Sequence, residues 1–283
     1  MKNYRAELTG VFGDPVDDNP TCVIEEAAYE AKGLNYRYLT IKVLPEDLEA
    51  AIKSVRVFGM KGINLTMPHK IQVIPFLDEL TEAASIIGAV NTVINKDGKL
   101  IGENTDGKGF VSSLQDSGVS LKGQIVTILG AGGAARAIAV ECALAGAKHI
   151  NVINRTASKG QELAELVKEK TNAESAFLPW DEAVQIPENT QILINATSIG
   201  LKPYHDQKPD IDYHSIKEGM VVCDVVFNPE DTLFLQAARE KGARTFSGLG
   251  MLTAQGALNF TLWTGEEAPV DLMFEALKKE FEE

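Results

Sequence analysis

The sequence contains few of the residues that form disulfide frameworks or metal sites. Its 283 residues include three cysteines and four histidines. Cys22, Cys142 and Cys223 are odd in number and lie far apart, so they fit neither a disulfide framework nor a zinc motif. Free cysteines are typical of a reducing compartment, and we therefore expect a cytoplasmic protein. The histidines are equally scattered, so we expect no metal site.

Long apolar runs and an excess of positive charge are also missing. The chain has no run of 18 apolar residues, which argues against a membrane span, and its first residues lack the apolar core of a signal peptide. The formal net charge of −13 argues against nucleic acid or an anionic membrane as a partner. A small anionic ligand remains compatible, because the local field at a site can oppose the overall charge. The sequence leaves both a monomer and a homodimer open.

Short apolar strands alternate with helical stretches along the chain, which predicts an α/β fold with mostly parallel sheets. A hairpin is expected at Asp97-Gly98, because this dipeptide suits a tight turn. In the first part of the chain we expect strands at 7–12, 36–41, 62–65, 90–95 and 99–102, and helices at about 23–32, 45–55 and 107–117.

The most informative motif is a glycine loop that begins at Gly130 and ends at Ala135. It follows an apolar strand at 124–129 and precedes a helix at 136–145. In this context Gly130 permits a tight turn, and Gly132 lets the backbone approach a pyrophosphate at the helix N-terminus. The loop therefore predicts a dinucleotide site, although a tight turn in a packed sheet is the structural alternative.

The end of the next strand indicates which dinucleotide is bound. NAD-binding folds usually place an acidic residue there, about 20 residues past the loop. This chain has Asn154 and Arg155 after the strand at 150–153. A guanidinium attracts a 2′-phosphate, and no carboxylate is present to repel it. The motif predicts NADP, with a solvated surface arginine as the alternative.

The position of the glycine loop also predicts two domains. The loop begins only after a complete α/β unit, so we expect a substrate-binding domain at 1–106 and a Rossmann NADP-binding domain at 107–250. Further strands at 192–195, 221–225 and 245–246 would complete the second sheet. The helices expected at 252–263 and 270–280, within the C-terminal segment 251–283, return to the first domain. The ligand would then lie in the cleft between the domains.

Three polar clusters fall near the expected cleft. Lys70 follows the strand at 62–65 and opens a helix, where the helix dipole disfavours a cation. Such a local inconsistency hints at function. Asn91 lies in the second cluster, and Asn104 and Asp106 in the third are typical of an N-terminal helix cap. The Asp106 carboxylate can cap the helix and still pair with Lys70. The structural alternatives are that Lys70 is a solvated surface lysine and that Asp106 is only a helix cap.

These clusters belong to a set of motifs that extends over nearly the whole chain. The motifs are N-L-T-M-P-H-K (64–70), G-A-V-N-T (88–92), N-T-D-G-K-G-F (104–110), G-A-G-G-A-A-R-A (130–137), N-R-T (154–156), N-A-T-S-I-G (195–200) and G-L-G-M-L-T-A-Q-G-A-L-N-F-T-L-W-T-G (248–265). In this order they resemble the shikimate dehydrogenases. The resemblance implies a substrate domain, a Rossmann NADP domain and reversible reduction of 3-dehydroshikimate to shikimate, a step of chorismate and aromatic amino acid biosynthesis.

The resemblance assigns roles to individual residues. Lys70 and Asp106 match the catalytic pair, in which the lysine gives a proton to the forming alkoxide. The residues that match substrate-binding positions are Asn19, Thr21, Thr66, Asn91 and Gln255. The residues that match cofactor-binding positions are Gly130, Gly132, Gly133, Ala134, Asn154, Arg155, Thr156, Lys159, Thr197, Phe227, Gly248 and Met251.

The chain departs from the family pattern near its N-terminus. The family usually has a Ser-x-Ser motif whose hydroxyls bind the substrate carboxylate, whereas this chain has Asn19-Pro20-Thr21. Thr21 still offers a hydroxyl and Asn19 an amide, although a turn and a helix cap are the structural alternative. The carboxylates of the neighbouring Asp17 and Asp18 should repel the carboxylate of an anionic substrate. Phe227 stands where the family often has tyrosine, which removes one hydroxyl.

These departures leave the substrate open between shikimate, quinate and another cyclic polyhydroxy acid. Two further alternatives are an NADP-binding sensor without turnover and a methylenetetrahydrofolate dehydrogenase. Lys70 and Asp106 argue against the sensor, because a protein that only binds NADP needs no proton-transfer pair. The low aromatic content of 7% argues against a pterin site.

Overall fold

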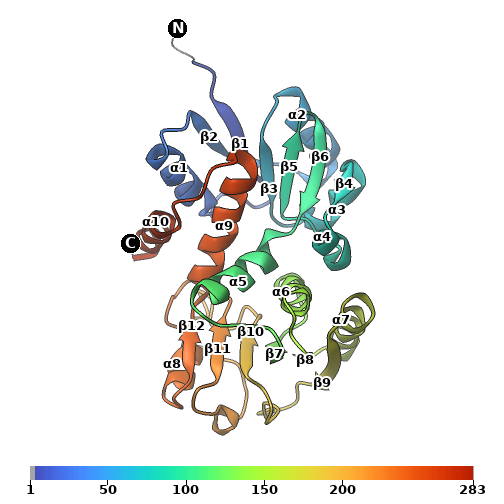
Figure 1. The fold of residues 1–283 in the computed structure, drawn as a ribbon, viewed down its shortest axis with the longest axis vertical. Helices are drawn as coiled ribbons and strands as arrows, with labels where there is room; N and C mark the ends of the chain where they lie inside the picture. Colours follow the sequence, from blue (N-terminus) through green and yellow to red (C-terminus); the bar gives the residue numbers. More distant parts are fainter. Residues whose placement is uncertain (1–3, 283) are drawn as a thin grey trace. The chain divides into compact units, whose positions relative to one another are not determined.

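The computed structural model describes residues 4–282; residues 1–3 and 283, which are the outermost ends of the expected first domain, lie outside the described residues. The chain divides into two compact units (Figure 1). Unit 1 comprises Met1–Thr105 and Thr253–Glu283, and unit 2 comprises Asp106–Leu252. Each unit contains a six-stranded sheet.

The sheet of unit 1 has the strand order β2-β1-β3-β5-β6-β4. β1 pairs in parallel with β2 and β3, whereas β5 is antiparallel to both β3 and β6. The Asp97-Gly98 turn joins β5 to β6 with positive φ at both residues, which confirms the expected hairpin. The strands are β1 (Glu7–Gly13), β2 (Tyr36–Lys42), β3 (Gly62–Leu65), β4 (Glu79–Leu80), β5 (Thr92–Lys96) and β6 (Lys99–Glu103).

Helices cover both faces of this sheet. On one face α2 buries Leu48, Ile52 and Val55, whose spacing of four and three residues places them on one helix face. On the other face Tyr29 of α1 stacks on Phe260 of α9, with 5.6 Å between ring centroids, and α10 packs on α1. The helices are α1 (Thr21–Ala31), α2 (Leu48–Val57), α3 (His69–Gln72), α4 (Glu82–Ile87), the part of α9 (Gly248–Thr264) from Thr253 onward, and α10 (Val270–Glu282).

The sheet of unit 2 is parallel throughout and has the order β12-β11-β10-β7-β8-β9. The chain starts at the central strand β7, moves outward through β8 and β9, and then returns to β10 on the other side. This reversal is the topological switch point of a doubly wound Rossmann sheet, which confirms the predicted fold class. The strands are β7 (Ile125–Leu129), β8 (His149–Asn154), β9 (Glu174–Pro179), β10 (Ile192–Asn195), β11 (Val221–Asp224) and β12 (Arg244–Phe246).

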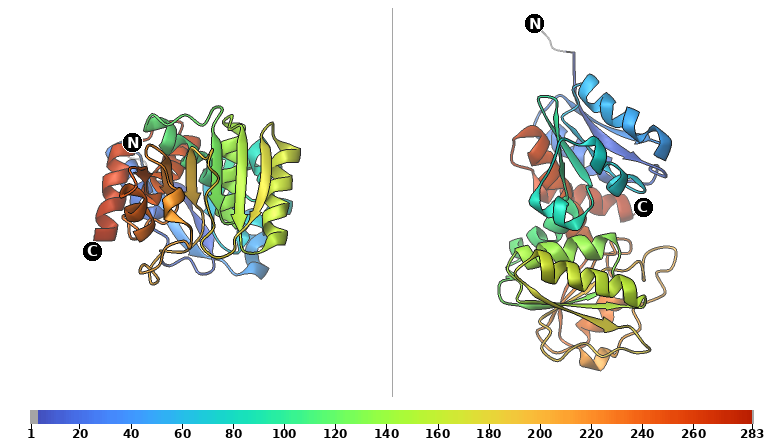
Figure 2. Two further views of the ribbon diagram at one scale, coloured as in Figure 1. Left: turned by 90° about the horizontal axis from the view of Figure 1, so that it is seen from below. Right: turned by 90° about the vertical axis from the view of Figure 1, so that its right-hand side faces the viewer.

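Alternate strand residues of unit 2 contribute to two cores, one on each face of the sheet. Ile128 belongs to the core that contains side chains of α5, α6 and α7, whereas Leu129 belongs to the core that contains α8. Figure 2 shows the strands side by side with α6 and α7 on the same side of the sheet. The helices are α5 (Thr105–Asp116), α6 (Gly133–Leu144), α7 (Ala157–Lys170) and α8 (Leu233–Arg239).

Three local expectations need correction. Asp106 lies in the first turn of α5 and is not its cap, because the helix already begins at Thr105. Lys70 lies in α3, a single turn of four residues, so an unfavourable helix dipole is not a sound argument for its function. Thr21 is the first residue of α1, and the residue at the cap position, Pro20, makes no side-chain cap bond.

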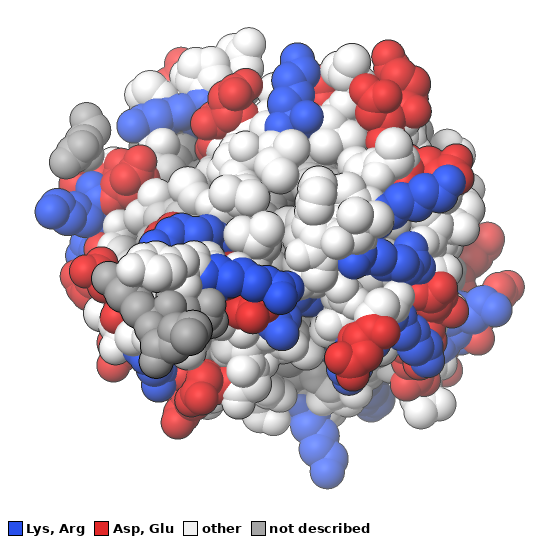
Figure 3. Space-filling view, turned by 90° about the horizontal axis from the view of Figure 1, so that it is seen from above, with Lys and Arg blue, Asp and Glu red and all other residues white. Residues whose placement is uncertain are grey.

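The surface and the described residues add three findings. Acidic and basic side chains alternate on the face shown in Figure 3, so this face carries no broad basic patch. Among the described residues, no helix is both long and apolar enough to cross a membrane. Residues 4–282 also contain no group of three or more His, Cys, Asp or Glu side chains arranged to hold a metal ion.

Candidate active site

Unit 1 contains a buried network of polar side chains that includes two of the predicted substrate-binding residues. Asn91 Oδ1 accepts a hydrogen bond from the backbone N of Thr105 at 2.7 Å, and Asn91 Nδ2 donates to Thr105 Oγ1 at 3.0 Å. Asn259 Oδ1 accepts from the hydroxyls of Thr92 and Thr105, each at 2.9 Å. Asn259 Nδ2 donates to Gln255 Oε1 at 3.2 Å. The network therefore joins Asn91 of the first segment to Gln255 of the C-terminal segment.

The network continues to the end of β3. Asn64 Nδ2 donates to Thr92 Oγ1 at 3.0 Å, and Asn64 Oδ1 accepts from the Tyr38 hydroxyl at 2.8 Å. Thr66 follows two residues later and is half-buried. Nothing local to Tyr38, Thr92 and Asn259 in the sequence shows that they meet, so their part in this network could not be predicted.

The backbone holds Lys70 beside this network. The Lys70 carbonyl accepts a hydrogen bond from Val90 N at 2.7 Å, and the Asn91 carbonyl accepts from Leu65 N at 2.8 Å. The neighbouring His69 is fully buried, and its Nε2 lies 2.8 Å from the Val43 carbonyl oxygen. Lys70 itself is half-buried.

Asp106 is the residue that follows Thr105 and is the first residue of unit 2. Its half-buried carboxylate lies in the first turn of α5, where the helix dipole favours a negative charge. The two predicted catalytic residues thus belong to different units, Lys70 to unit 1 and Asp106 to unit 2.

The loop before α1 has the geometry of a turn. Asn19 Oδ1 accepts a hydrogen bond from Thr21 N at 3.0 Å, so this side chain supports the turn that was its structural alternative. Thr21 is buried and Asn19 is half-buried. The loop lies beside Thr66, because Thr66 N donates to the Phe12 carbonyl at 3.0 Å and Asp14 N donates to the Met67 carbonyl at 3.0 Å.

In unit 2 the glycine loop has the predicted geometry. Gly130 has a φ of +109°, and a Cβ there would lie 2.9 Å from the Ala196 carbonyl oxygen, so the turn requires glycine. Gly132 and Gly133 are exposed and lead into α6, and a Cβ at either would meet no atom within 4 Å. The N-terminus of α6, including Ala134, is therefore open to a phosphate.

A second cluster follows β8. Asn154 Nδ2 donates to the Thr156 carbonyl at 2.9 Å, while Arg155, Thr156 and Lys159 are exposed. A hollow of about 500 Å³ lies at the carboxyl ends of β8, β9 and β10, the edge at which open α/β sheets bind nucleotides. It is lined by Arg155, Trp180, Asp181, Glu182, Ile199, Gln207, Lys208 and Asp210. Arg155 and Lys159 can supply positive charge to a 2′-phosphate, so these residues fit a 2′-phosphorylated dinucleotide.

Thr197 is linked through Asn195 to a buried aspartate, Asp224, that was not predicted from the sequence. The Thr197 hydroxyl donates to Asn195 Oδ1 at 2.7 Å, and Asn195 Nδ2 donates to Asp224 Oδ1 at 2.9 Å. Asp224 also accepts from Val226 N at 3.0 Å and from the Thr232 hydroxyl at 2.7 Å. Burial outweighs these three donors and raises the pKa of Asp224 to about 6.

The remaining predicted cofactor residues follow β11 or lie in α9. Phe227 and Met251 are half-buried. Gly248 is buried at the start of α9, and a Cβ there would lie 2.3 Å from the Val225 carbonyl oxygen. Only glycine therefore allows the backbone of α9 to approach this loop.

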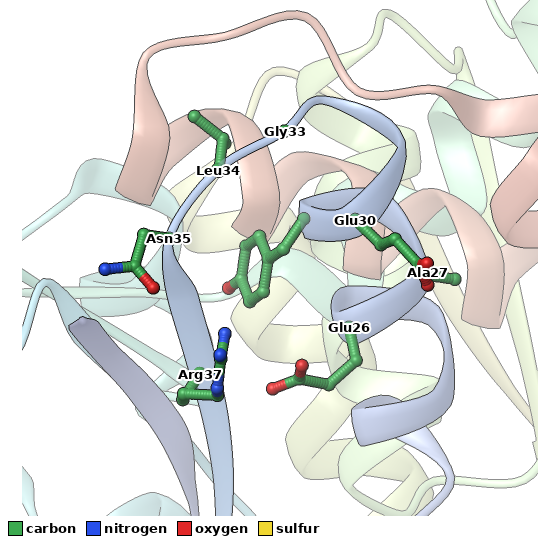
Figure 4. Close-up of a pocket in the computed structure, with 8 residues that line it drawn as sticks. Glu26, Ala27, Glu30, Gly33, Leu34, Asn35 and Arg37 are labelled. Atoms are coloured by element: carbon green, nitrogen blue, oxygen red, sulfur yellow. The ribbon is translucent and has the colours of Figure 1, made fainter. Parts of the chain in front are cut away.

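A separate hollow of about 640 Å³ lies on unit 1 at the outer side of α1 and β2 (Figure 4). Its lining includes Glu26, Glu30 and Arg37, but none of the predicted substrate or cofactor residues. We therefore do not assign it to the candidate active site.

Three models of protein families match the chain in order. The model described as the shikimate dehydrogenase substrate binding domain matches residues 11–93, and the one described as shikimate / quinate 5-dehydrogenase matches residues 113–227. The shikimate 5′-dehydrogenase C-terminal domain matches residues 248–278. The chain belongs to the shikimate dehydrogenase family. This assignment confirms the resemblance on which the sequence analysis relied.

Individual relatives extend over nearly the whole chain. A shikimate dehydrogenase (NADP(+)) from Desulforamulus reducens is 41% identical over 98% of this chain and 97% of its own length. Among solved structures, the ligand-free 5-ketofructose reductase of Gluconobacter sp. strain CHM43 is 45% identical with a TM-score of 0.96, and the match covers 99% and 100% of the two chains. The shikimate 5-dehydrogenase of Thermus thermophilus, in complex with NADP(H) and shikimate, is 34% identical with a TM-score of 0.83, and the match covers 96% and 99%.

Proposed function

We propose that this protein is an NADP-dependent shikimate dehydrogenase, which reversibly reduces 3-dehydroshikimate to shikimate. The observation that carries the proposal is the buried network of Asn91, Thr105, Asn259 and Gln255 beside the Lys70 turn. A network of this kind presets polar groups at the site where a polyhydroxylated substrate must be oriented. The family membership supports the same activity.

In this proposal one unit binds the substrate and the other binds the cofactor. Unit 1 binds the substrate: Thr66, Asn91 and Gln255 hold its ring hydroxyls, and Asn19 and Thr21 hold its far end. Unit 2 binds the cofactor through the glycine loop and Arg155. The cofactor, when bound, supplies the hydride. The boundaries at 105/106 and 252/253 separate these two roles.

The residues of the chain then have to transfer one proton to or from the substrate oxygen. The Lys70 ammonium donates a proton to the alkoxide oxygen as the hydride arrives at the adjacent carbon, and it takes the proton back in the oxidative direction. Asp106 balances the charge of the lysine and keeps it oriented. General acid–base assistance of this kind is typically worth about 10²–10⁴ in rate.

The test is a substrate panel read by the absorbance of reduced nicotinamide. Lys70→Met should lower kcat by about 10²–10⁴ while NADP binding, measured by calorimetry, stays unchanged. Lys53→Met is the matched control, because Lys53 is an exposed lysine of α2 that pairs with Glu49. Wild-type turnover in Lys70→Met would refute the mechanism. Absence of turnover with every member of the panel would favour an NADP-binding sensor.

A second candidate function has its own support. The 5-ketofructose reductase structure has 45% identity to this chain, and the Asn19-Pro20-Thr21 loop departs from the Ser-x-Ser pattern. We therefore include 5-ketofructose in the panel together with 3-dehydroshikimate and quinate. Preference for 5-ketofructose would assign the same chemistry to an uncharged substrate.

We also propose that the protein is cytoplasmic, acts on a small molecule without a nucleic-acid partner, and is a monomer or a homodimer. All three cysteines are free, which is consistent with a reducing compartment. Light scattering of the purified protein measures the oligomeric state directly.

A further inference from the structure

Asp224 is a buried acid that the proposed mechanism does not use. It is the last residue of β11 and is 2% exposed. Its Oδ1 accepts hydrogen bonds from Asn195 Nδ2 and Val226 N, and its Oδ2 accepts one from the Thr232 hydroxyl. Burial raises its pKa to about 6, so the carboxylate is charged at neutral pH although a buried charge is costly. The partners of this charge indicate what it does.

The first partner connects Asp224 to the β10 loop, residues 196–199. Asn195 ends β10, and its Oδ1 accepts from the Thr197 hydroxyl at 2.7 Å and from Thr197 N at 3.2 Å. The Thr197 oxygen accepts from Ile199 N at 3.1 Å. The only hydroxyl proton of Thr197 is thus used within the loop, so this side chain shapes the loop. The loop lies against the glycine loop, because a Cβ on Gly130 would be 3.0 Å from Thr197 Cγ2.

The second partner connects Asp224 to the β11 loop, residues 225–227. Val226 N donates to Asp224 Oδ1 at 3.0 Å, and the Val226 carbonyl accepts from Gly248 N at 3.1 Å. A Cβ on Gly248 would lie 2.3 Å from the Val225 carbonyl oxygen, so the start of α9 is pressed against this loop. Asp224 therefore sets the backbone between two predicted cofactor residues, Phe227 and Gly248.

The strand order shows which half of a dinucleotide these two loops would meet. The strands β8, β7, β10 and β11 are consecutive neighbours in the sheet of unit 2 (Figure 1). In the proposed function Arg155, after β8, attracts the 2′-phosphate, and the glycine loop, after β7, takes the pyrophosphate. The cofactor then continues across β10 and β11, since neighbouring strands lie about 4.8 Å apart. Its nicotinamide half therefore meets the β10 and β11 loops.

We propose that Asp224 is a positioning residue for the nicotinamide half of the cofactor. It acts through Asn195 and Val226, which set the β10 and β11 loops, and it does not touch the reacting atoms. The inference rests on the proposed NADP-dependent dehydrogenase activity and assigns a further residue to its hydride-transfer step.

The physical reason is that one carboxylate fixes both loops. Hydride transfer requires the reacting groups to be held within about 0.5 Å of the productive geometry. Removal of the carboxylate leaves the Asn195 amide and Val226 N without this acceptor in a buried place, so the two loops have to rearrange. None of the three donors to Asp224 belongs to β8, α6 or α7. The sites of the 2′-phosphate and the pyrophosphate should therefore keep their geometry.

The test compares two ligands by calorimetry at neutral pH. NADPH is the whole cofactor, whereas adenosine 2′,5′-bisphosphate carries the 2′-phosphate but no nicotinamide. Asp224→Ala should weaken NADPH binding about tenfold, which corresponds to about 1.4 kcal/mol and is typical of a lost hydrogen bond to a charged group. The affinity for the bisphosphate should not change. Asp224→Asn keeps an oxygen acceptor for Asn195 and Val226, so it should recover most of the loss.

Turnover provides a second readout of the same variants. With NADPH saturating, Asp224→Ala should lower kcat and leave KM for the ketone unchanged, because the substrate residues belong to unit 1. Thr197→Val removes the hydroxyl that joins Asn195 to the β10 loop and should also weaken NADPH selectively. Thr190→Val is its matched control: Thr190 is buried and lies 2.7 Å from the Thr127 hydroxyl, but it precedes β10 at the opposite edge of the sheet.

The two ligands separate positioning from a general effect on the fold. Equal weakening of NADPH and the bisphosphate in Asp224→Ala or in Thr197→Val would show a structural role and overturn the inference. NADPH binding that is unchanged in Thr197→Val would also overturn it, and this arm does not depend on the folding of Asp224→Ala. Selective loss of NADPH in a protein whose wild type reduces no ketone of the panel would uphold the role of Asp224 and refute the proposed function.

Discussion

The buried carboxylate of Asp224 makes unit 2 sensitive to pH in a direction that can be calculated. Asp224 is 2% exposed, and burial raises its pKa from the ordinary value of 3.8 to about 6. The folded state therefore holds a proton that the unfolded state releases between pH 4 and pH 6. Because the folded form binds more protons in this range, its stability falls as the pH rises and levels off above the folded pKa.

The two pKa values set the size of the effect. For a shift from 3.8 to about 6, linkage gives a loss of about 1 kcal/mol in the free energy of unfolding between pH 5 and pH 7. Asp224→Asn removes this titration but keeps the shape of the side chain. The variant will differ from the wild type in absolute stability, because one of the donors from Asn195, Thr232 and Val226 loses an acceptor. That cost is the same at both pH values.

The assay is urea unfolding followed by circular dichroism at pH 5 and pH 7 for both proteins. The difference in unfolding free energy between wild type and Asp224→Asn should change by about 1 kcal/mol between the two pH values, with the wild type gaining stability at pH 5. The NMR signal of the Val226 amide, which donates to Asp224 Oδ1, should titrate with a midpoint near pH 6. A difference that is equal at both pH values would refute the reasoning.

Two further predictions concern the cofactor and substrate sites. Arg155→Ala should weaken NADP binding by about 10- to 100-fold and leave NAD binding unchanged, because a charge-assisted contact to the 2′-phosphate is lost. Calorimetry measures the affinity for both cofactors, and Lys168→Ala on α7 is the control. Equal losses for the two cofactors would contradict the assignment. Asn259→Ala should destabilise the protein by about 1–3 kcal/mol, because the buried hydroxyls of Thr92 and Thr105 lose their shared acceptor. Urea unfolding measures this cost, and unaltered stability would show that the network does not constrain the fold.

Features that depend on local backbone geometry could be predicted from the sequence. Gly130 and the Asp97-Gly98 turn adopt the positive φ values that these residues favour. The strand before the glycine loop and the helix after it are the local features that identify the loop as a dinucleotide site. Arg155 was found because its position relative to that loop is constrained by the topology of the sheet.

Features that depend on partners far apart in the chain were missed. Asp224 meets Asn195 across 29 residues, and Asn259 meets Thr92 across 167 residues. Neither pairing leaves a local pattern in the sequence. No element was assigned to residues 157–170, although Leu163 and Val167 form a buried stripe at helical spacing in α7. The single turn of α3 was too short for a periodicity to reveal its true extent.

The division of the chain has a consequence for the order in which the protein is made. Residues 106–252 form unit 2 without a break, so its sheet can assemble as soon as this segment has left the ribosome. Unit 1 has to wait for Thr253–Glu283, which supply Gln255 and Asn259 to the network around Asn91 and Thr105. A nascent chain can thus complete the sheet of unit 2 before the polar network of unit 1. That network needs residues 253–283, which are synthesised after all of unit 2.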